Sequence, residues 1–131
     1  MRGTRILAVI PARAGSKGIP NKNVRIVAGR PLIYFSIRNA LESEFITDVV
    51  VTTDSDQVRI IAEQMGARVR MRDASLCADD VALDAVVHDA AFGEGEPGGW
   101  DWIVTMQPTS PTLSVATLDA AIGKAIDEDL D

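Results

Sequence analysis

Short runs of β-branched and other apolar residues alternate along this chain with longer stretches in which apolar residues recur at helical spacing. The short runs predict strands at 6–10, 49–53, 68–71 and 103–106. The stretches that follow them predict four helices, with apolar stripes inside 32–41, 58–65, 83–91 and 115–126. Four alternations of strand and helix are typical of a parallel sheet covered by helices through right-handed crossovers. The pattern therefore predicts an α/β fold with a mainly parallel sheet.

Residues at the ends of these segments support the same division. Pro31 suits a helix start, Ser55 or Asp54 suits the N-cap of the second helix, and Gly66 suits its end. Ser114 is the predicted cap of the fourth helix. The glycine-rich stretch 93–99 could pass for a domain linker, but its length fits a surface turn inside a single domain that covers residues 1–131.

Ligands of open parallel sheets bind beyond the carboxyl ends of the strands. The loops 12–23, 54–56 and 107–111 each follow a predicted strand, so we expect all three on one rim of the sheet. The first of them is the most informative, because residues 10–23 read IPARAGSKGIPNKN. Its glycines allow close approach of the backbone to an anion, while Arg13, Lys17 and Lys22 supply positive charge. This composition predicts a cradle for a nucleoside triphosphate.

The loop contains neither the G-x-G-x-x-G pattern of dinucleotide-binding proteins nor the Walker P-loop pattern. If this loop binds phosphate, it therefore belongs to a different phosphate-binding family.

Charge is distributed unevenly along the chain. The first 41 residues contain eight Lys and Arg residues and no acidic residue, since the first one is Glu42. The whole chain nevertheless has a net charge of −6. A net acidic protein binds nucleic acid and anionic membranes poorly, so the basic end fits a small phosphorylated ligand better than either of these partners. The alternative is a basic face that only confers solubility.

Composition limits the class of protein and the kinds of site that this chain can contain. An apolar content of 47% in 131 residues is that of an ordinary globular domain. A single cysteine, Cys77, excludes an internal disulfide, and a single histidine, His88, leaves no zinc cluster of the usual type. We therefore expect a reducing compartment, the cytoplasm. The apolar run 6–10 is too short for a membrane span.

Four motifs together resemble the acylneuraminate cytidylyltransferases, the CMP-sialic acid synthetases. They are the loop 10–23, the strand 49–54 (VVVTTD), the segment 72–79 (RDASLCAD) and the turn 106–111 (MQPTSP). They occur in the family's order across nearly the whole chain.

The resemblance implies a Rossmann-like, three-layer α/β/α nucleotidyltransferase fold. It also implies transfer of CMP from CTP to the anomeric hydroxyl of a nine-carbon keto sugar acid, with release of pyrophosphate and a requirement for Mg²⁺. By the same resemblance the triphosphate is held by Arg13 and Lys22, as the catalytic pair, with Gly15, Ser16, Lys17 and Asn23 completing the nucleotide site. Arg72 would read cytosine, and Gln107 would contact the sugar.

Several of these residues have a plainer interpretation. Arg72 could be a surface cation, Asn23 a turn residue, and the segment around Gln107 a rigid turn. Asp54 and Asp56 form a D-x-D pair that could hold a metal, but we favour helix capping, because acids stabilise the start of a helix. For Asp84 and His88, four residues apart, we favour a solvated helix pair over acid–base chemistry. For Cys77 we favour a small buried thiol, and for Trp100 and Trp102 packing.

The resemblance covers only the N-terminal part of a family catalytic domain. In the family, later segments supply the carboxylate pair that holds Mg²⁺, further sugar contacts and the dimerisation segment. We therefore expect little CMP-sugar synthesis by this chain alone, and we expect a homodimer or higher oligomer because an open sheet edge favours self-association. The alternatives are a nucleotide-binding module without turnover and a cytidylyltransferase for another keto sugar acid such as Kdo. The run from Gly18 to Asn23 argues against the Kdo enzymes.

Overall fold

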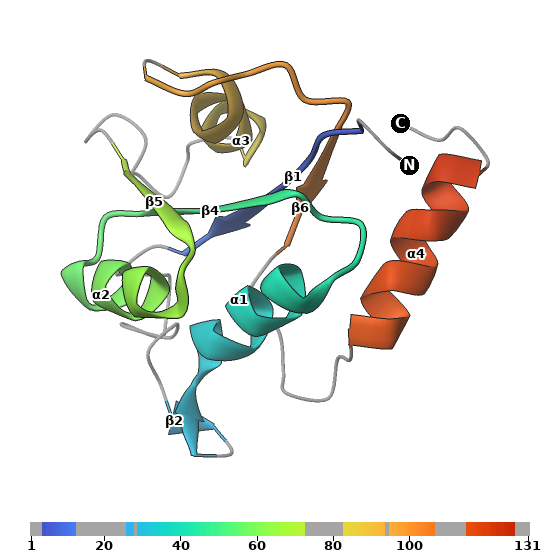
Figure 1. The fold of residues 1–131 in the computed structure, drawn as a ribbon. Helices are drawn as coiled ribbons and strands as arrows, with labels where there is room; N and C mark the ends of the chain where they lie inside the picture. Colours follow the sequence, from blue (N-terminus) through green and yellow to red (C-terminus); the bar gives the residue numbers. More distant parts are fainter. Residues whose placement is uncertain are drawn as a thin grey trace.

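A computed structural model of the chain describes residues 4–12, 26–27, 29–72, 83–93, 95–106 and 115–127. The helices and strands follow one another in the predicted alternation, and the first strand leads into a short hairpin before the first helix (Figure 1). In chain order they are β1 (Ile6–Pro11), β2 (Ile26–Val27), β3 (Arg30–Pro31), α1 (Leu32–Glu42), β4 (Asp48–Thr53), α2 (Asp56–Met65), β5 (Arg68–Met71), α3 (Leu83–Phe92), β6 (Trp102–Thr105) and α4 (Val115–Asp127).

The four long strands form one sheet in the order β5-β4-β1-β6, and every pairing in it is parallel. The predicted parallel α/β fold is therefore confirmed. The sequence placed β6 one residue too late at both ends, since the strand begins at Trp102 and ends at Thr105. β1 is fully buried from Leu7 to Ile10 because it has a neighbouring strand on each side and helices on both faces.

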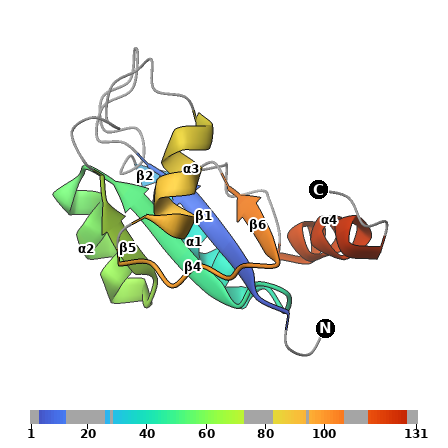
Figure 2. The same cartoon turned by 90° about the horizontal axis from the view of Figure 1, so that it is seen from above.

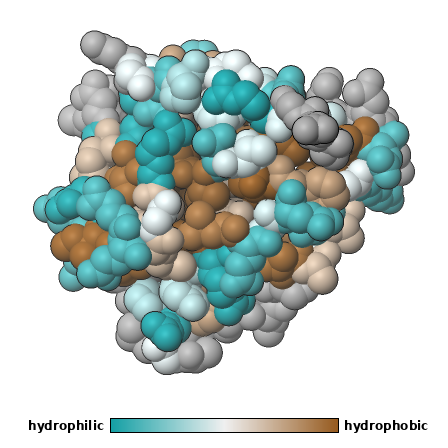
Figure 3. All heavy atoms as spheres, in the orientation of Figure 1, coloured by the Kyte–Doolittle hydropathy of each residue, from teal (hydrophilic) through white to brown (hydrophobic). Residues whose placement is uncertain are grey.

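Alternate residues of each strand face opposite sides of the sheet. One buried cluster joins the sheet to α1 and α2, and its members include Ala8, Ile10, Val49, Val51, Ile33, Ile37, Val58 and Ala62. A second, smaller cluster joins the other face to α3 through Leu7, Val9, Val50, Ala90 and Ala91. Figure 1 shows α3 on one side of the sheet and α1 and α2 on the other. In the same orientation, apolar residues gather in a band at the level of the sheet, with hydrophilic residues above and below it (Figure 3).

The small antiparallel pairing of β2 with β3 was not predicted. Gly29 lies between the two strands at a φ of 81°, a left-handed conformation that glycine adopts without strain. Each strand has only two residues, which is too short for a periodic signal. Pro31 belongs to β3 and is the N-cap of α1, whose first residue is Leu32, so the predicted helix start after Pro31 is confirmed.

α4 lies beside the sheet edge formed by β6 and is joined to the end of α1 (Figures 1 and 2). The Ser43 hydroxyl donates to one carboxylate oxygen of Asp119 in α4, and the Glu44 N–H donates to the other at 3.2 Å. None of the helices within the described ranges has the length and apolar character that a membrane crossing requires.

An ion-pair clamp fastens the edge strand β5 to α3 and to the connection that follows it. The Arg70 Nε and Nη2 atoms donate to the two oxygens of Asp89 at 2.8 and 2.9 Å. Glu96 accepts from Arg70 Nη1 at 3.3 Å and from Arg68 Nη1 at 2.8 Å. A Cβ on Gly93 would collide with Arg70 Nη2 and the Asp89 carbonyl, so this close approach requires glycine. The stretch 93–99 is thus an anchored surface turn in its described residues.

The hydrogen bonds from Arg70 hold the pKa of the Asp89 carboxyl below its ordinary value of 3.8, despite the opposing effect of burial. The positive charges of Arg70, His88 and Arg72 act in the same direction as the hydrogen bonds. A depressed folded-state pKa means that the clamp stabilises the protein above pH 3.8 and that this contribution is lost as the pH falls through the folded-state value.

We therefore expect Asp89→Asn to lower the free energy of unfolding by about 1.5–3 kcal/mol at neutral pH, the range for hydrogen bonds to charged groups. The difference from the wild type should shrink below about pH 4 as the wild-type carboxyl is protonated. Urea unfolding at a series of pH values measures both effects. Glu63→Gln is the matched control, because Glu63 pairs with Arg59 at 3.0 Å on the exposed face of α2 and should change stability by less than about 0.5 kcal/mol. An equal loss in both variants would contradict the clamp.

Candidate nucleotide site at the carboxyl rim

The four parallel strands end together on one side of the molecule, where the arrowheads of β1, β4 and β6 point the same way (Figure 2). Backbone hydrogen bonds continue the pairing past the strand ends. The Ala12 N–H donates to the Thr52 carbonyl at 3.0 Å, the Arg72 N–H to the Thr53 carbonyl at 2.9 Å, and the Met106 N–H to the Val9 carbonyl at 2.9 Å. The chain therefore leaves β1, β5 and β6 at the same edge of the sheet, as predicted for a ligand-binding rim.

Of the predicted site residues, only Arg72 is among those that the structure describes. Its half-buried side chain extends from the end of β5 toward Thr52 of the adjacent strand β4. The other predicted contacts lie outside the described residues: Arg13, Gly15, Ser16, Lys17, Lys22, Asn23 and Gln107, together with Cys77 and Ser114. Their roles stay predictions, but the described residues fix where two of these segments begin, at Ala12 and at Met106.

Arg72 donates two hydrogen bonds to Thr52. Its Nε donates to the Thr52 hydroxyl oxygen at 3.3 Å, and its Nη2 donates to the Thr52 carbonyl oxygen at 3.3 Å. Arg68 and Arg70 precede it at every second position of β5, and both contact carboxylates on the α3 side of the sheet. The sequence reasoning missed Thr52. The available signal was a threonine at the end of a valine strand, opposite the arginine-rich strand.

The segment after β4 is a helix start. Ser55 is the N-cap of α2, because its hydroxyl oxygen accepts from the Val58 N–H at 3.2 Å, while the Ser55 N–H donates to the Thr53 hydroxyl at 3.0 Å. Asp56 lies 3.5 Å from Arg59 in the first turn, and Gly66 ends the helix at a φ of 92°. These contacts confirm the predicted caps and favour capping for the D-x-D pair. Within the described ranges, no three His, Cys, Asp or Glu residues are grouped so that they could hold a metal.

Residues on the α3 side of the sheet bear on two further sequence predictions, those for the pair of Asp84 with His88 and for Trp100. Asp84 and His88 are both exposed, and the His88 ring packs against Phe92 at 5.3 Å between centroids, in keeping with a solvated helix face. Trp100 has a packing role, since its Nε1 donates to the Ala91 carbonyl at 3.1 Å and the Arg5 guanidinium lies 4.2 Å from its ring centre.

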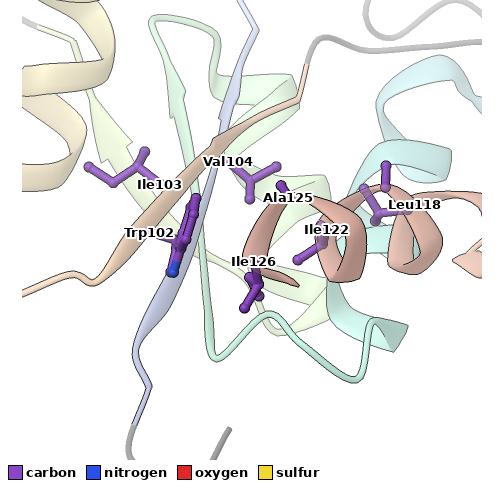
Figure 4. A pocket seen from close by; sticks show the side chains of 8 residues that line it. Trp102, Ile103, Val104, Leu118, Ile122, Ala125 and Ile126 are labelled. Atoms are coloured by element: carbon purple, nitrogen blue, oxygen red, sulfur yellow. The ribbon is translucent and has the colours of Figure 1, made fainter. Parts of the chain in front are cut away.

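A groove of about 260 Å³ lies between β6 and α4, at the sheet edge (Figure 4). Its lining is almost wholly apolar and consists of Trp102, Ile103, Val104, Leu118, Ala121, Ile122, Ala125 and Ile126. A triphosphate requires cations and N–H donors, so this groove is unsuited to it. The rim remains the better candidate for a nucleotide.

Comparison with known proteins identifies the family of this chain. The family profile described as Cytidylyltransferase matches residues 7–130. A CMP-N,N'-diacetyllegionaminic acid synthase of Legionella pneumophila is 42% identical over 120 residues, covering 90% of this chain and 52% of that protein. An N-acylneuraminate cytidylyltransferase of Escherichia coli is 39% identical over 108 residues, covering 82% of this chain and 25% of that protein.

A solved structure of CMP:2-keto-3-deoxy-manno-octonic acid synthetase complexed with CTP superimposes with a TM-score of 0.73 at 22% identity. The match covers 96% of this chain and 49% of that one, and at this identity it shows a shared fold. The chain thus spans about half the length, or less, of the proteins it matches.

Substitutions at Ser55 test how much the N-cap of α2 contributes to stability. We expect Ser55→Ala to lower the free energy of unfolding by about 1 kcal/mol, since the Val58 N–H would lose its acceptor. Ser55→Asp should retain most of the stability because its carboxylate can accept the same bond. Chemical denaturation measures both variants, and an unchanged Ser55→Ala protein would show that the cap contributes nothing.

Proposed function

This chain belongs to the cytidylyltransferase family, whose profile spans residues 7–130, and we propose that it transfers CMP from CTP to the anomeric hydroxyl of a sialic acid-like nine-carbon keto sugar acid, releasing pyrophosphate. The observation that carries this proposal is the Arg72 guanidinium, held at the carboxyl rim by Thr52 and adjacent to the strand that leads into the basic loop. The relatives named above, which are synthases and cytidylyltransferases of acidic sugars, support the substrate class.

Arg72 has the donors that a cytosine base requires. A guanidinium presents several N–H groups in one plane, and cytosine presents O2 and N3 as neighbouring acceptors on one edge. Purines present a different edge at a different distance from the sugar. An arginine fixed in orientation at the rim therefore provides a physical basis for pyrimidine choice.

The phosphates would be bound by the basic loop. Arg13 and Lys22 would neutralise charge on the triphosphate, and the remaining loop residues, Gly15, Ser16, Lys17 and Asn23, would complete the nucleotide site. Nucleotidyl transfer depends mainly on in-line positioning and on neutralisation of developing charge, so it requires no nucleophilic side chain. Gln107, the residue after Met106 in the sequence, would contact the sugar acid.

A second candidate is the same reaction with Kdo, the eight-carbon keto sugar acid. Its support is the structural match to an enzyme that activates 2-keto-3-deoxy-manno-octonic acid. The higher identity to the legionaminic and N-acylneuraminic acid enzymes favours the nine-carbon acids. A nucleotide-binding module without turnover is the remaining alternative, and it would retain CTP binding.

The proposal includes Mg²⁺, which the family resemblance implies. The described residues do not by themselves fit a magnesium site, because they contain no group of three acidic or other ligating side chains. The proposal also includes a cytoplasmic location, for which the support is that a single cysteine forms no internal disulfide.

Nucleotide choice tests the role of Arg72. We expect CTP with Mg²⁺ to bind more tightly than ATP or GTP in calorimetric titrations, and Arg72→Ala to lose most of this preference. Lys124→Ala is the matched control, because it removes a cation from exposed α4, away from the rim. Equal affinity of the wild type for all three nucleotides would remove the assignment of Arg72, and no binding of any nucleotide would remove the site.

The basic loop is tested separately from folding. Arg13→Ala and Lys22→Ala should each weaken CTP binding by at least tenfold while changing the free energy of unfolding by less than about 1 kcal/mol. Calorimetry and thermal unfolding of the same preparations measure the two effects. Large losses of stability with unchanged CTP affinity would show that both residues are structural.

We expect this chain to associate with a second copy of itself. β6 is an edge strand of the described sheet, and the apolar groove lies beside it. Both features favour pairing with a second chain. We expect light scattering to give the mass of a homodimer or larger assembly, and a monomer at micromolar concentration would contradict this expectation.

A further inference from the structure

Thr52 is a buried polar residue at the point where the two predicted nucleotide-contacting segments meet. Its exposed fraction is 0%. Its hydroxyl oxygen accepts from Arg72 Nε at 3.3 Å. Its carbonyl oxygen accepts from Arg72 Nη2 at 3.3 Å and also from the backbone N–H of Ala12 at 3.0 Å. One residue therefore contacts both the arginine assigned to the base and the residue that precedes Arg13.

The position itself does not require a hydroxyl for packing. In β4, Val50 and Thr52 face the α3 side of the sheet, and Val50 packs in the apolar cluster there. A valine at position 52 would have nearly the same shape. A buried hydroxyl lowers stability unless it is hydrogen-bonded. The Thr52 hydroxyl accepts its hydrogen bond from the Arg72 guanidinium. This contact indicates that the hydroxyl serves to hold the Arg72 side chain.

Two contacts on one edge of a guanidinium fix the plane of the group as well as its position. The Thr52 hydroxyl and carbonyl are both uncharged, so they orient Arg72 without cancelling its positive charge. Nearby Asp89 does carry a charge, and its two oxygens accept hydrogen bonds from Arg70. Arg70 therefore donates hydrogen bonds to a carboxylate, whereas Arg72 donates to the neutral oxygens of Thr52, and the Asp89 charge also acts on Arg72.

We propose that Thr52 is a positioning residue for nucleotide recognition: it sets the orientation of the Arg72 guanidinium and couples that group to the first residue of the phosphate-binding loop. This inference rests on the proposed function and adds a residue to it. Thr52 is fully buried and is not proposed to touch the nucleotide. Its effect on binding would pass through Arg72, and that dependence is what an experiment can isolate.

The test is a double-mutant cycle on the full chain with CTP affinity as the readout. Thr52→Val retains the shape and the carbonyl but removes the acceptor for Arg72 Nε, and we expect it to weaken CTP binding about tenfold. Thr52→Ser restores a hydroxyl and should stay within about twofold of the wild type. In an Arg72→Ala background, Thr52→Val should have no further effect, because the group that it positions is absent.

A matched control separates positioning from general loss of a hydroxyl. Thr47→Val removes a hydroxyl that bonds the Ile6 N–H at 2.9 Å at the opposite end of the sheet, and it should lower stability without changing CTP affinity. A second readout does not depend on the ligand. The NMR signal of the Arg72 Nε–Hε group should be protected from solvent exchange in the wild type and in Thr52→Ser, and should exchange faster in Thr52→Val.

The outcomes distinguish this inference from the proposed function. If the wild type binds CTP but Thr52→Val binds it equally well, or if its loss simply adds to that of Arg72→Ala, the positioning role is overturned while the proposed function stands. If the wild type binds no CTP, the proposed function fails, and the recognition role of Thr52 fails with it even where the Nε–Hε signal is protected.

Discussion

Parallel pairing of β1 with β4 on one side and with β6 on the other is the constraint around which this molecule is arranged. Parallel neighbours cannot be joined by a tight turn, so each connection must cross a face of the sheet, and the helices supply these crossings. The crossings bury both faces of β1, whose residues Leu7 to Ile10 are completely inaccessible. The same geometry brings the carboxyl ends of all four strands to one rim. Fold stability and the location of the candidate site therefore have a common cause.

The arginines at positions 68, 70 and 72 have two different kinds of contact. On the α3 side, Arg68 and Arg70 contact Glu96 and Asp89 and fasten the edge strand β5 to its neighbours. One residue past the end of that strand, Arg72 contacts the uncharged Thr52 at the rim. The first two arginines thus pair with carboxylates, whereas Arg72 donates hydrogen bonds to the neutral oxygens of Thr52 and also acts on the Asp89 charge.

Much of this arrangement was predictable from local pattern. Period-two runs and helical stripes located the long strands and helices, and Ser55 and Gly66 marked the ends of α2 because capping depends on neighbouring backbone atoms. The motif residues predict Arg72 as a site residue; the structure places it directly after β5, and its role stays a prediction. The hairpin of β2 and β3 was missed because two-residue strands have no periodicity. Thr52, Asp89 and Glu96 were missed because their roles arise from partners 19 to 28 residues away on other elements, which sequence spacing does not reveal.

The central claim is that a cytidine nucleotide binds at the carboxyl rim of this sheet. Titration of the isotope-labelled chain with CTP and Mg²⁺, followed by backbone amide NMR, tests it most directly. The account predicts the largest shift changes at the amides that follow the strands, those of Ala12, Asp54, Arg72 and Met106, with little change at Ile103 or Ile126 in the apolar groove. Shifts centred on the groove, or on the amino ends of the strands, would contradict it.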